Sequence, residues 1–280
     1  MVMWVRDTRL RKSLADLEAA YQAERNAAQM NAQLASRLQK LYEQEDLPVL
    51  TGVLLSSWYQ AAAEGIKIGG DWYKAVRLDE DRMLLGIGDV SGHGIDAALT
   101  MGKVRRLILT SALVEKDPGR ILEALNSAML AEGQIVTALL GVLSVREGRV
   151  TYAIAGHCRP ILVAPDGRAR FLSNDMFPLG VQEQVKFRRF SERLEPGSRL
   201  ILYTDGLLEF KRSPIETEPT LLDAASSLSG YHDRDFAERF VRAVIGSASP
   251  PDDVAVLAIS MLDQTSSIQS RMVAVGAGSA

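Results

Sequence analysis

Short runs of Leu, Ile and Val, each bounded by Gly, Pro or Asp, recur through most of this 280-residue chain. They include Met83 to Ile87, Arg199 to Thr204 and Val254 to Ile259. Runs of this length and composition are typical of buried β-strands. The turn signals Glu147-Gly148 and Asp166-Gly167 separate further short strands. Hairpins of this kind predict sheets that are largely antiparallel.

Apolar periodicity and turn residues predict the order of elements along the chain. Helices are expected at Ile95 to Val114, Arg120 to Ala131, Thr220 to Leu228 and Arg234 to Ile245. Strands are expected at Val53 to Ala63, Trp72 to Leu78, Met83 to Val90, Val136 to Val145, Arg149 to Ala155, Ile161 to Ala164 and Ala169 to Leu172. The acidic turn at 79–81 predicts a hairpin of two of these strands. Together these elements indicate an α+β fold.

The first 47 residues differ in character from the rest. Between Thr8 and Glu45 there is no Gly or Pro, which predicts one long helix that ends before Pro48. Apolar residues keep heptad-like spacing at Leu10, Leu14, Leu17 and Tyr21. This stripe fits a coiled coil that pairs two copies of the chain, or a single amphipathic helix that lies on its own domain. We therefore expect a helical linker at 1–47, a globular domain at 48–262 and a flexible tail at 263–280.

Charge and cysteine content argue against several classes of function. The formal charge is −3, so no overall basic field favours binding to nucleic acid. Cys158 is the only cysteine, which excludes an intramolecular disulfide and argues against a cysteine-based zinc site. A reducing cytoplasm is the expected setting. No apolar run approaches the roughly 20 residues that span a bilayer, so we expect no membrane insertion.

Four aspartates stand at the ends of apolar runs: Asp71, Asp89, Asp205 and Asp252. An ionised carboxylate is seldom buried unless it is paired or binds a cation. Acids that converge from several strand ends would make an oxygen-only site, which suits Mg²⁺ or Mn²⁺. Asp is also a common turn residue, and for any single one of the four that interpretation stays open. The set of four favours a metal site.

A metal site of this kind has a defined chemistry. Carboxylates on different strands can hold two divalent ions roughly 3.5 to 4 Å apart, with a shared hydroxide between them. This arrangement suits hydrolysis of a phosphate ester and requires no nucleophilic side chain. The chain has three histidines, His93, His157 and His232, and no Gly-x-Ser-x-Gly motif. Metal-assisted hydrolysis therefore fits the sequence better than a serine-based or histidine-rich site.

Seven short motifs occur in a fixed order along the chain. They are Gly69-Gly70-Asp71-Trp72-Tyr73, Gly88-Asp89-Val90-Ser91-Gly92-His93-Gly94, Thr137-Ala138-Leu139, Ala155-Gly156-His157, Pro178-Leu179-Gly180, Tyr203-Thr204-Asp205-Gly206-Leu207 and Asp252-Asp253-Val254. The ordered set resembles the metal-dependent protein phosphatases (PPM type) related to protein phosphatase 2C. Within them it is similar to the bacterial branch typified by stage II sporulation protein E and by the phosphatases of stress sigma-factor pathways. The resemblance spans Val53 to Ile259 and implies an α-β-β-α sandwich of two antiparallel sheets flanked by helices.

The resemblance also implies a role for each acid. Asp71 would hold one of two Mn or Mg ions, and Asp89 would bridge both with help from the carbonyl of Val90. Asp205 and Asp252 would hold the other ion. Residues expected around these ligands are Gly70, Gly92, His93 and Asp253. His93 is expected to shape the loop rather than donate a proton, and glycine at 92 and 94 would let the backbone turn tightly beside the ions.

The implied activity is dephosphorylation of phosphoserine or phosphothreonine on a signalling protein. Members of the branch often act on a small anti-sigma-factor antagonist, and the N-terminal helix fits the linker that precedes them. Lys74 and the pair Cys158-Arg159 depart from the usual pattern of the branch without removing a metal ligand. Two alternatives stay open: a catalytically silent phosphatase-like scaffold, and a nucleotide cyclase, which Gly69-Gly70-Asp71 alone would suggest.

Overall fold

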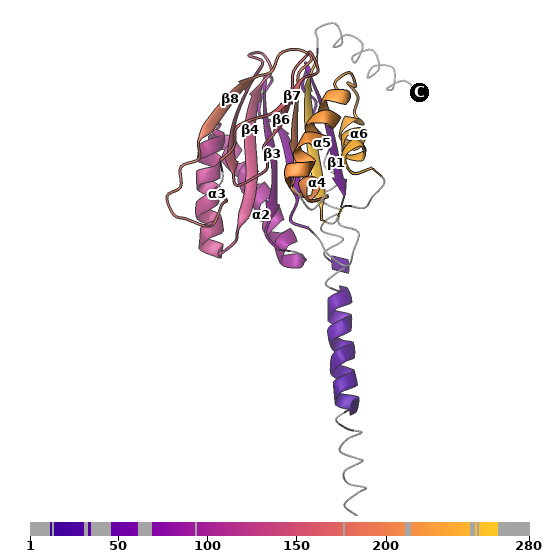
Figure 1. Ribbon diagram of the computed structural model, residues 1–280. Coiled ribbons are helices and arrows are strands. Elements are labelled where there is room, and N and C mark those ends of the chain that lie inside the picture. Colours follow the sequence, from indigo (N-terminus) through magenta and orange to yellow (C-terminus); the bar gives the residue numbers. More distant parts are fainter. Residues whose placement is uncertain are drawn as a thin grey trace, which may run out of the picture.

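In the described part of the chain, ten strands form two five-stranded sheets that stack face to face, with helices on both outer surfaces (Figure 1). The computed structural model describes residues 12, 14–30, 33–34, 46–60, 69–92, 94–175, 177–210, 214–246, 250 and 252–262. Three expectations lie wholly or partly outside these residues: the flexible tail at 263–280, the role of His93, and the two ends of the long helix expected from Thr8 to Glu45.

Each sheet is antiparallel throughout. The first sheet has the strand order β1-β10-β9-β6-β7 and the second has the order β2-β3-β4-β5-β8. In the first sheet the bounds are β1 Val53–Gln60, β10 Val254–Met261, β9 Arg199–Tyr203, β6 Ile161–Val163 and β7 Ala169–Phe171. In the second they are β2 Trp72–Arg77, β3 Arg82–Val90, β4 Val136–Ser144, β5 Arg149–Ala155 and β8 Arg189–Arg193.

Helices cover the outer face of each sheet. The second sheet packs against α2 (Ile95–Val114) and α3 (Pro118–Glu132). The first sheet packs against α4 (Gly206–Glu209), α5 (Pro214–Ser227) and α6 (Phe236–Ile245). A further helix at residues 14–30 lies apart from both sheets (Figure 1). None of the helices in the described ranges is long and apolar enough to cross a membrane.

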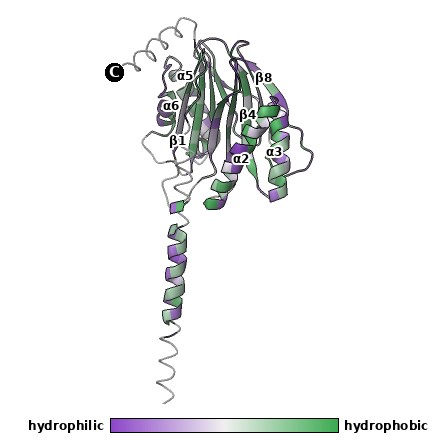
Figure 2. Ribbon diagram, turned by 180° about the vertical axis from the view of Figure 1, so that it is seen from behind, coloured by the Kyte–Doolittle hydropathy of each residue, from purple (hydrophilic) through white to green (hydrophobic). Residues whose placement is uncertain are grey.

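Alternation along the strands fills three apolar layers. In β3, Met83, Leu85 and Ile87 pack between the two sheets, whereas Leu84 and Val90 pack against α2 and α3. Successive side chains of β9 and β10 alternate in the same way, between the layer that separates the sheets and the layer under α5 and α6. The strands are accordingly hydrophobic along most of their length (Figure 2). Both faces of both sheets are covered, which is why the strands are recognisable as continuous apolar runs.

The predicted fold class is confirmed, with some errors in the elements. The bounds of α2 and β5 agree with the prediction. The start of α5 was placed at Thr220, but the helix begins at Pro214 and includes Pro219. Proline is favoured at the first helical position, as at Pro214, whereas Pro219 lies inside the helix and removes a backbone donor there, which is why the pattern predicted a later start. Two elements were missed: β8, an edge strand with alternating exposed residues, and α4, a single helical turn.

Candidate metal centre

Strand ends from both sheets meet at one edge of the sandwich. In the second sheet, Asp71 directly precedes β2 and Asp89 is the penultimate residue of β3. Because β2 and β3 are antiparallel, the start of one lies beside the end of the other. In the first sheet, Asp205 lies two residues beyond Tyr203, and β10 begins at Val254 beside this end of β9. The four predicted acids therefore lie at the same edge, as the sequence suggested.

Strand alternation places the acids of the second sheet on its inner face. Tyr73 and Ile87 pack in the layer between the sheets. Asp71 and Asp89 are each two residues further toward the edge, and side chains two residues apart share a face of a strand. The carboxyl groups thus extend the inter-sheet layer to its rim, where apolar packing ends. A polar site follows directly from the same alternation that builds the core.

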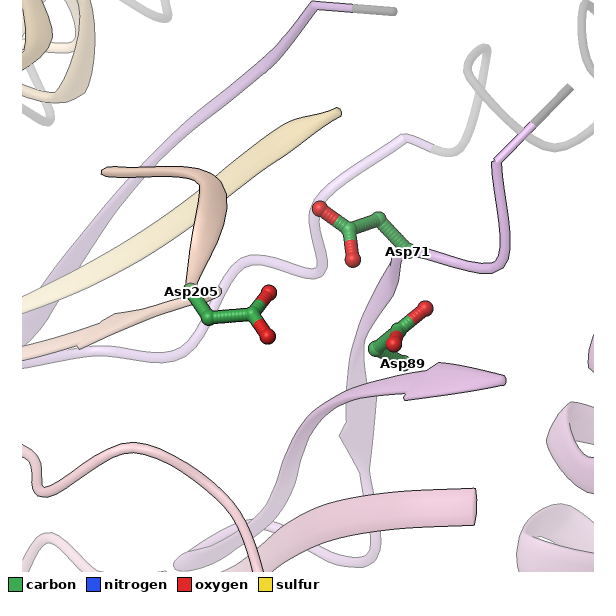
Figure 3. A group of neighbouring side chains, drawn as sticks. All are labelled: Asp71, Asp89 and Asp205. Atoms are coloured by element: carbon green, nitrogen blue, oxygen red, sulfur yellow. The ribbon is translucent and has the colours of Figure 1, made fainter. Parts of the chain in front are cut away.

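Three of the acids converge. Asp71, Asp89 and Asp205 each offer a carboxylate oxygen, and these atoms all lie within 4.8 Å of one another (Figure 3). Asp71 is buried, Asp89 is half-buried and Asp205 is exposed, so the group is open on one side. The donors are all oxygen atoms, as Mg²⁺ and Mn²⁺ prefer. The residues present therefore fit a divalent cation.

The electrostatics of the cluster favour a cation. Burial, and then the charge of Asp89, raises the pKa of Asp71 well above its ordinary value. Burial and repulsion from Asp205, Asp252 and Asp253 raise the pKa of Asp89 from 3.8 to about 7. Desolvation of its carboxyl group, followed by repulsion from Asp252, raises the pKa of Asp205. In all three acids, burial and neighbouring carboxylates disfavour the charged form, which a cation at this place would stabilise.

Thr204 orients the most buried of the three acids. Its hydroxyl donates to Oδ2 of Asp71 over 2.6 Å and accepts the backbone N–H of Ala255 at 2.8 Å. The bond to Asp71 lowers the pKa of that carboxyl and so opposes the effect of burial. Thr204 thereby links β9 and β10 to an acid of the other sheet. No role was predicted for Thr204 from the sequence, although it directly precedes Asp205 in the Tyr-Thr-Asp-Gly motif.

Asp252 and Asp253 occupy different environments. Asp252 is exposed, is not one of the three converging acids, and accepts the N–H of Asp253 on Oδ1 at 2.8 Å. Its role as a metal ligand stays a prediction. Asp253 is buried, and its Oδ2 accepts the hydroxyl of Tyr59 at 3.3 Å. A Cβ at Gly69 would lie 1.0 Å from the same oxygen, so only glycine allows this approach.

Close backbone packing also places the carbonyl of Val90. A Cβ at Gly70 would lie 2.1 Å from that carbonyl oxygen and 2.6 Å from Oδ1 of Asp89. Both oxygens therefore lie beside the same glycine, and the N–H of Val90 donates to the carbonyl of Gly70 at 3.2 Å. The expected pairing of Asp89 with the Val90 carbonyl is compatible with this geometry and remains a prediction. Gly92 follows in the left-handed region, with φ of 104°.

His157 has a structural position in the described chain. Nδ1 of its ring lies 2.9 Å from the hydroxyl of Thr137. This contact joins the turn after β5 to the start of β4. Burial lowers the pKa of His157 to about 4, so the ring is neutral at physiological pH. It is absent from the group of converging acids. These contacts give His157 a role in holding the turn after β5.

Comparison with known proteins identifies the family. The sequence pattern of Stage II sporulation protein E (SpoIIE) matches residues 79–262, which is more than half of the chain. The chain belongs to the SpoIIE family. The resemblance inferred from the ordered motifs is thereby confirmed.

Individual relatives support the same family and fold. Phosphoserine phosphatase RsbP from Bacillus subtilis (strain 168) is 29% identical over 184 residues, which cover 63% of this chain and 45% of RsbP. The crystal structure of the RsbU and RsbW domains of Rv1364c from Mycobacterium tuberculosis matches with a TM-score of 0.71 and 30% identity, over 77% of this chain and 62% of that one. The catalytic domain of the serine/threonine phosphatase PstP, solved with two manganese ions, shares the fold with a TM-score of 0.58 and 19% identity, over 75% of this chain and 99% of that one. This SpoIIE-family chain thus spans less than half the length of RsbP.

Replacing Thr204 by valine should weaken the binding of a divalent cation. Valine keeps the shape of the side chain but removes the hydroxyl that orients Asp71 and lowers its pKa. An unpaired buried polar group costs about 1–3 kcal/mol, and we expect Mn²⁺ affinity to fall roughly tenfold in isothermal titration calorimetry. Thr204→Ser keeps the hydroxyl and should bind like the unaltered chain. Equal affinities for the valine and serine variants would show that the hydroxyl has no such role.

Proposed function

We propose that this chain is a Mn²⁺- or Mg²⁺-dependent phosphatase that hydrolyses phosphoserine or phosphothreonine in a protein. The observation that carries the proposal is the convergence of Asp71, Asp89 and Asp205 at one edge of the sandwich. Membership of the SpoIIE family supports the reaction class, because the relative RsbP is named a phosphoserine phosphatase. A catalytically silent scaffold is less favoured, since such a scaffold would have no need to keep three mutually repelling acids together.

The acids would hold two ions in unequal roles. Asp89 would bridge the ions with the Val90 carbonyl beside it, and Asp71 would complete one site. Asp205 and Asp252, the two exposed acids, would bind the other ion. The manganese pair in PstP supports the number of two. Bound divalent ions supply positive charge to phosphate oxygens and lower the pKa of a bound water.

The protein's own groups would prepare the site before substrate binds. Thr204 fixes the orientation of Asp71, and the Tyr59 hydroxyl donates to Asp253 beside Gly69. Groups held in place in this way need no rearrangement when the phosphate arrives, which lowers the barrier to reaction. The exposed side of the cluster, at Asp205, is where a phosphoester would enter.

We infer that the phosphate is carried by a bacterial signalling protein, and that a small anti-sigma-factor antagonist is the favoured substrate. Support comes from the relatives: RsbP is named a phosphoserine phosphatase, and RsbU and RsbW domains occur together in Rv1364c. The acidic cluster itself contacts only the phosphate and the atoms next to it. Recognition of the protein must therefore come from surfaces around the cluster.

We also propose that the helix at residues 14–30 pairs two copies of the chain. Leu14, Leu17 and Tyr21 are 57%, 70% and 66% exposed on this helix, which lies apart from the sheets (Figure 1). An isolated helix of this length is marginal in water, and burial of an apolar stripe is the usual source of its stability. A second copy supplies the same stripe in a parallel or antiparallel coiled coil.

Substitution of Asp205 by asparagine should abolish metal-dependent turnover of p-nitrophenyl phosphate. We expect a loss of at least about 100-fold in kcat, because groups that only orient metal ligands already contribute roughly 10–100-fold. Asp166→Asn is the matched control, since Asp166 lies in an exposed turn and pairs with Arg168. Activity retained by Asp205→Asn, or lost equally in both variants, would contradict the assignment of Asp205.

Placing a charge in the apolar stripe should separate the two copies. Leu17→Glu puts a carboxylate at a seam position, and we expect the mass measured by light scattering to fall from that of a dimer to that of a monomer. Ala19→Glu places the same charge away from the stripe and should leave the mass unchanged. A monomeric mass for the unaltered chain would exclude pairing through this helix.

A further inference from the structure

Four exposed apolar side chains lie on segments that reach the edge carrying the acidic cluster. They are Leu99, Ile135, Phe177 and Val181, which are 56%, 45%, 44% and 49% exposed. Among the described residues from 46 onward, the other large apolar side chains with such exposure are Val49, Leu113, Val114 and Tyr231. Scattered apolar residues are normal on a protein surface, whereas a local group of them marks a site of interaction. We refer to Leu99, Ile135, Phe177 and Val181 as the rim patch.

Ile135 lies next to the loop that follows Asp89. Its backbone carbonyl accepts the N–H of Ser91 at 3.0 Å, two residues beyond Asp89. It also immediately precedes β4, the strand that pairs with β3. The side chain is therefore at the same edge as the acids, one strand away from Asp89.

Phe177 and Val181 lie on a segment that is bound to the start of β4. Leu179 and Val136 exchange two backbone hydrogen bonds of 3.2 and 2.8 Å. The buried side chain of Asn126 on α3 donates to and accepts from the backbone on either side of Val181, at 2.9 Å in both cases. The segment is thus held from two elements, and its apolar side chains are exposed although its backbone is fixed.

Leu99 approaches the same place from α2. Lys103 pairs with Glu132 near the end of α3, and Leu99 lies one turn closer to the start of α2 on the same face. Ile135 lies three residues beyond Glu132. The start of α2 and the end of α3 are at the same end of the domain in Figure 1. Lys103 and Glu132 pair with each other, so the opposite charges nearest to Leu99 offset one another.

We propose that the rim patch binds apolar residues that flank the phosphorylated serine or threonine of the protein substrate. The proposal rests on the phosphatase function proposed above. A phosphoester bound beside the acidic cluster is attached to a polypeptide, which has to extend across the surface around the cluster. The rim patch lies at the same edge as the cluster, with Ile135 beside the loop after Asp89, and it offers apolar area that favours Leu, Ile or Val over polar residues.

Two synthetic phosphoserine peptides of equal length and charge test this proposal. One carries Leu and Val on both sides of the phosphoserine, and the other carries Ser and Thr at those positions. With Mn²⁺ present, we expect kcat/KM to be roughly tenfold higher for the apolar peptide, as is usual when an apolar side chain enters an apolar site. Hydrolysis of p-nitrophenyl phosphate, which has no flanking residues, serves as the reference activity.

The double variant Leu99→Gln/Val181→Ser should lose this preference while it retains the reference activity. Leu113→Gln is the matched control, because Leu113 is 79% exposed on α2 but lies at the opposite end of the helix. This control should keep the preference.

Three outcomes would overturn the inference. One is equal kcat/KM for the two peptides with the unaltered chain. Another is a preference for the apolar peptide that survives in the double variant. If that variant keeps the preference but has a lower mass in light scattering, the patch joins two copies of the chain instead. The third is a preference that falls equally in Leu113→Gln. If the unaltered chain hydrolyses neither p-nitrophenyl phosphate nor either peptide, the proposed function fails, and the inference that rests on it fails too.

Discussion

Repulsion between three carboxylates is the constraint that shapes one whole edge of this protein. Asp71, Asp89 and Asp205 bring oxygens within 4.8 Å of one another. Two unit charges 4 Å apart interact with roughly 4 kcal/mol at an effective dielectric constant of 20, so the ionised group is costly without positive charge. Burial, and then repulsion from Asp205, Asp252 and Asp253, raises the pKa of Asp89 to about 7. Protons and divalent ions would compete for such a site, and a bound ion would offset the repulsion between the acids.

The sandwich brings the acids together through its ordinary strand geometry. Alternation directs Asp71 and Asp89 to the inner face of one sheet, and the stacking of the second sheet adds Asp205 from the other side. Glycine allows the turns that carry the acids to pack closely against each other. A Cβ at Gly206 would lie 2.0 Å from the carbonyl oxygen of Asp253. Thr204 then ties the two sheets together at the acid that is most deeply buried. The same strand arrangement therefore builds the apolar core and places the acidic cluster at its end.

The sequence allowed prediction of the parts that depend on local pattern. Covered strands appear as apolar runs, and the acids at their ends were identified for that reason. An exposed edge strand such as β8 carries no such run. The difference between Asp252 and Asp253 depends on how the turn before β10 directs two adjacent side chains, which no pattern specifies. Thr204 bonds to Asp71 across 133 positions, and the rim patch joins residues from α2 and from two loops, so both require the tertiary structure.

The most direct test of the metal centre is anomalous X-ray diffraction from crystals of the unaltered chain grown with Mn²⁺, measured at the manganese absorption edge. A cluster that holds two divalent ions predicts two anomalous peaks among the carboxylates of Asp71, Asp89, Asp205 and Asp252, both in contact with Asp89 and both lost in Asp89→Asn. Crystals with no peak among these acids at saturating Mn²⁺, or with peaks only elsewhere on the surface, would contradict it.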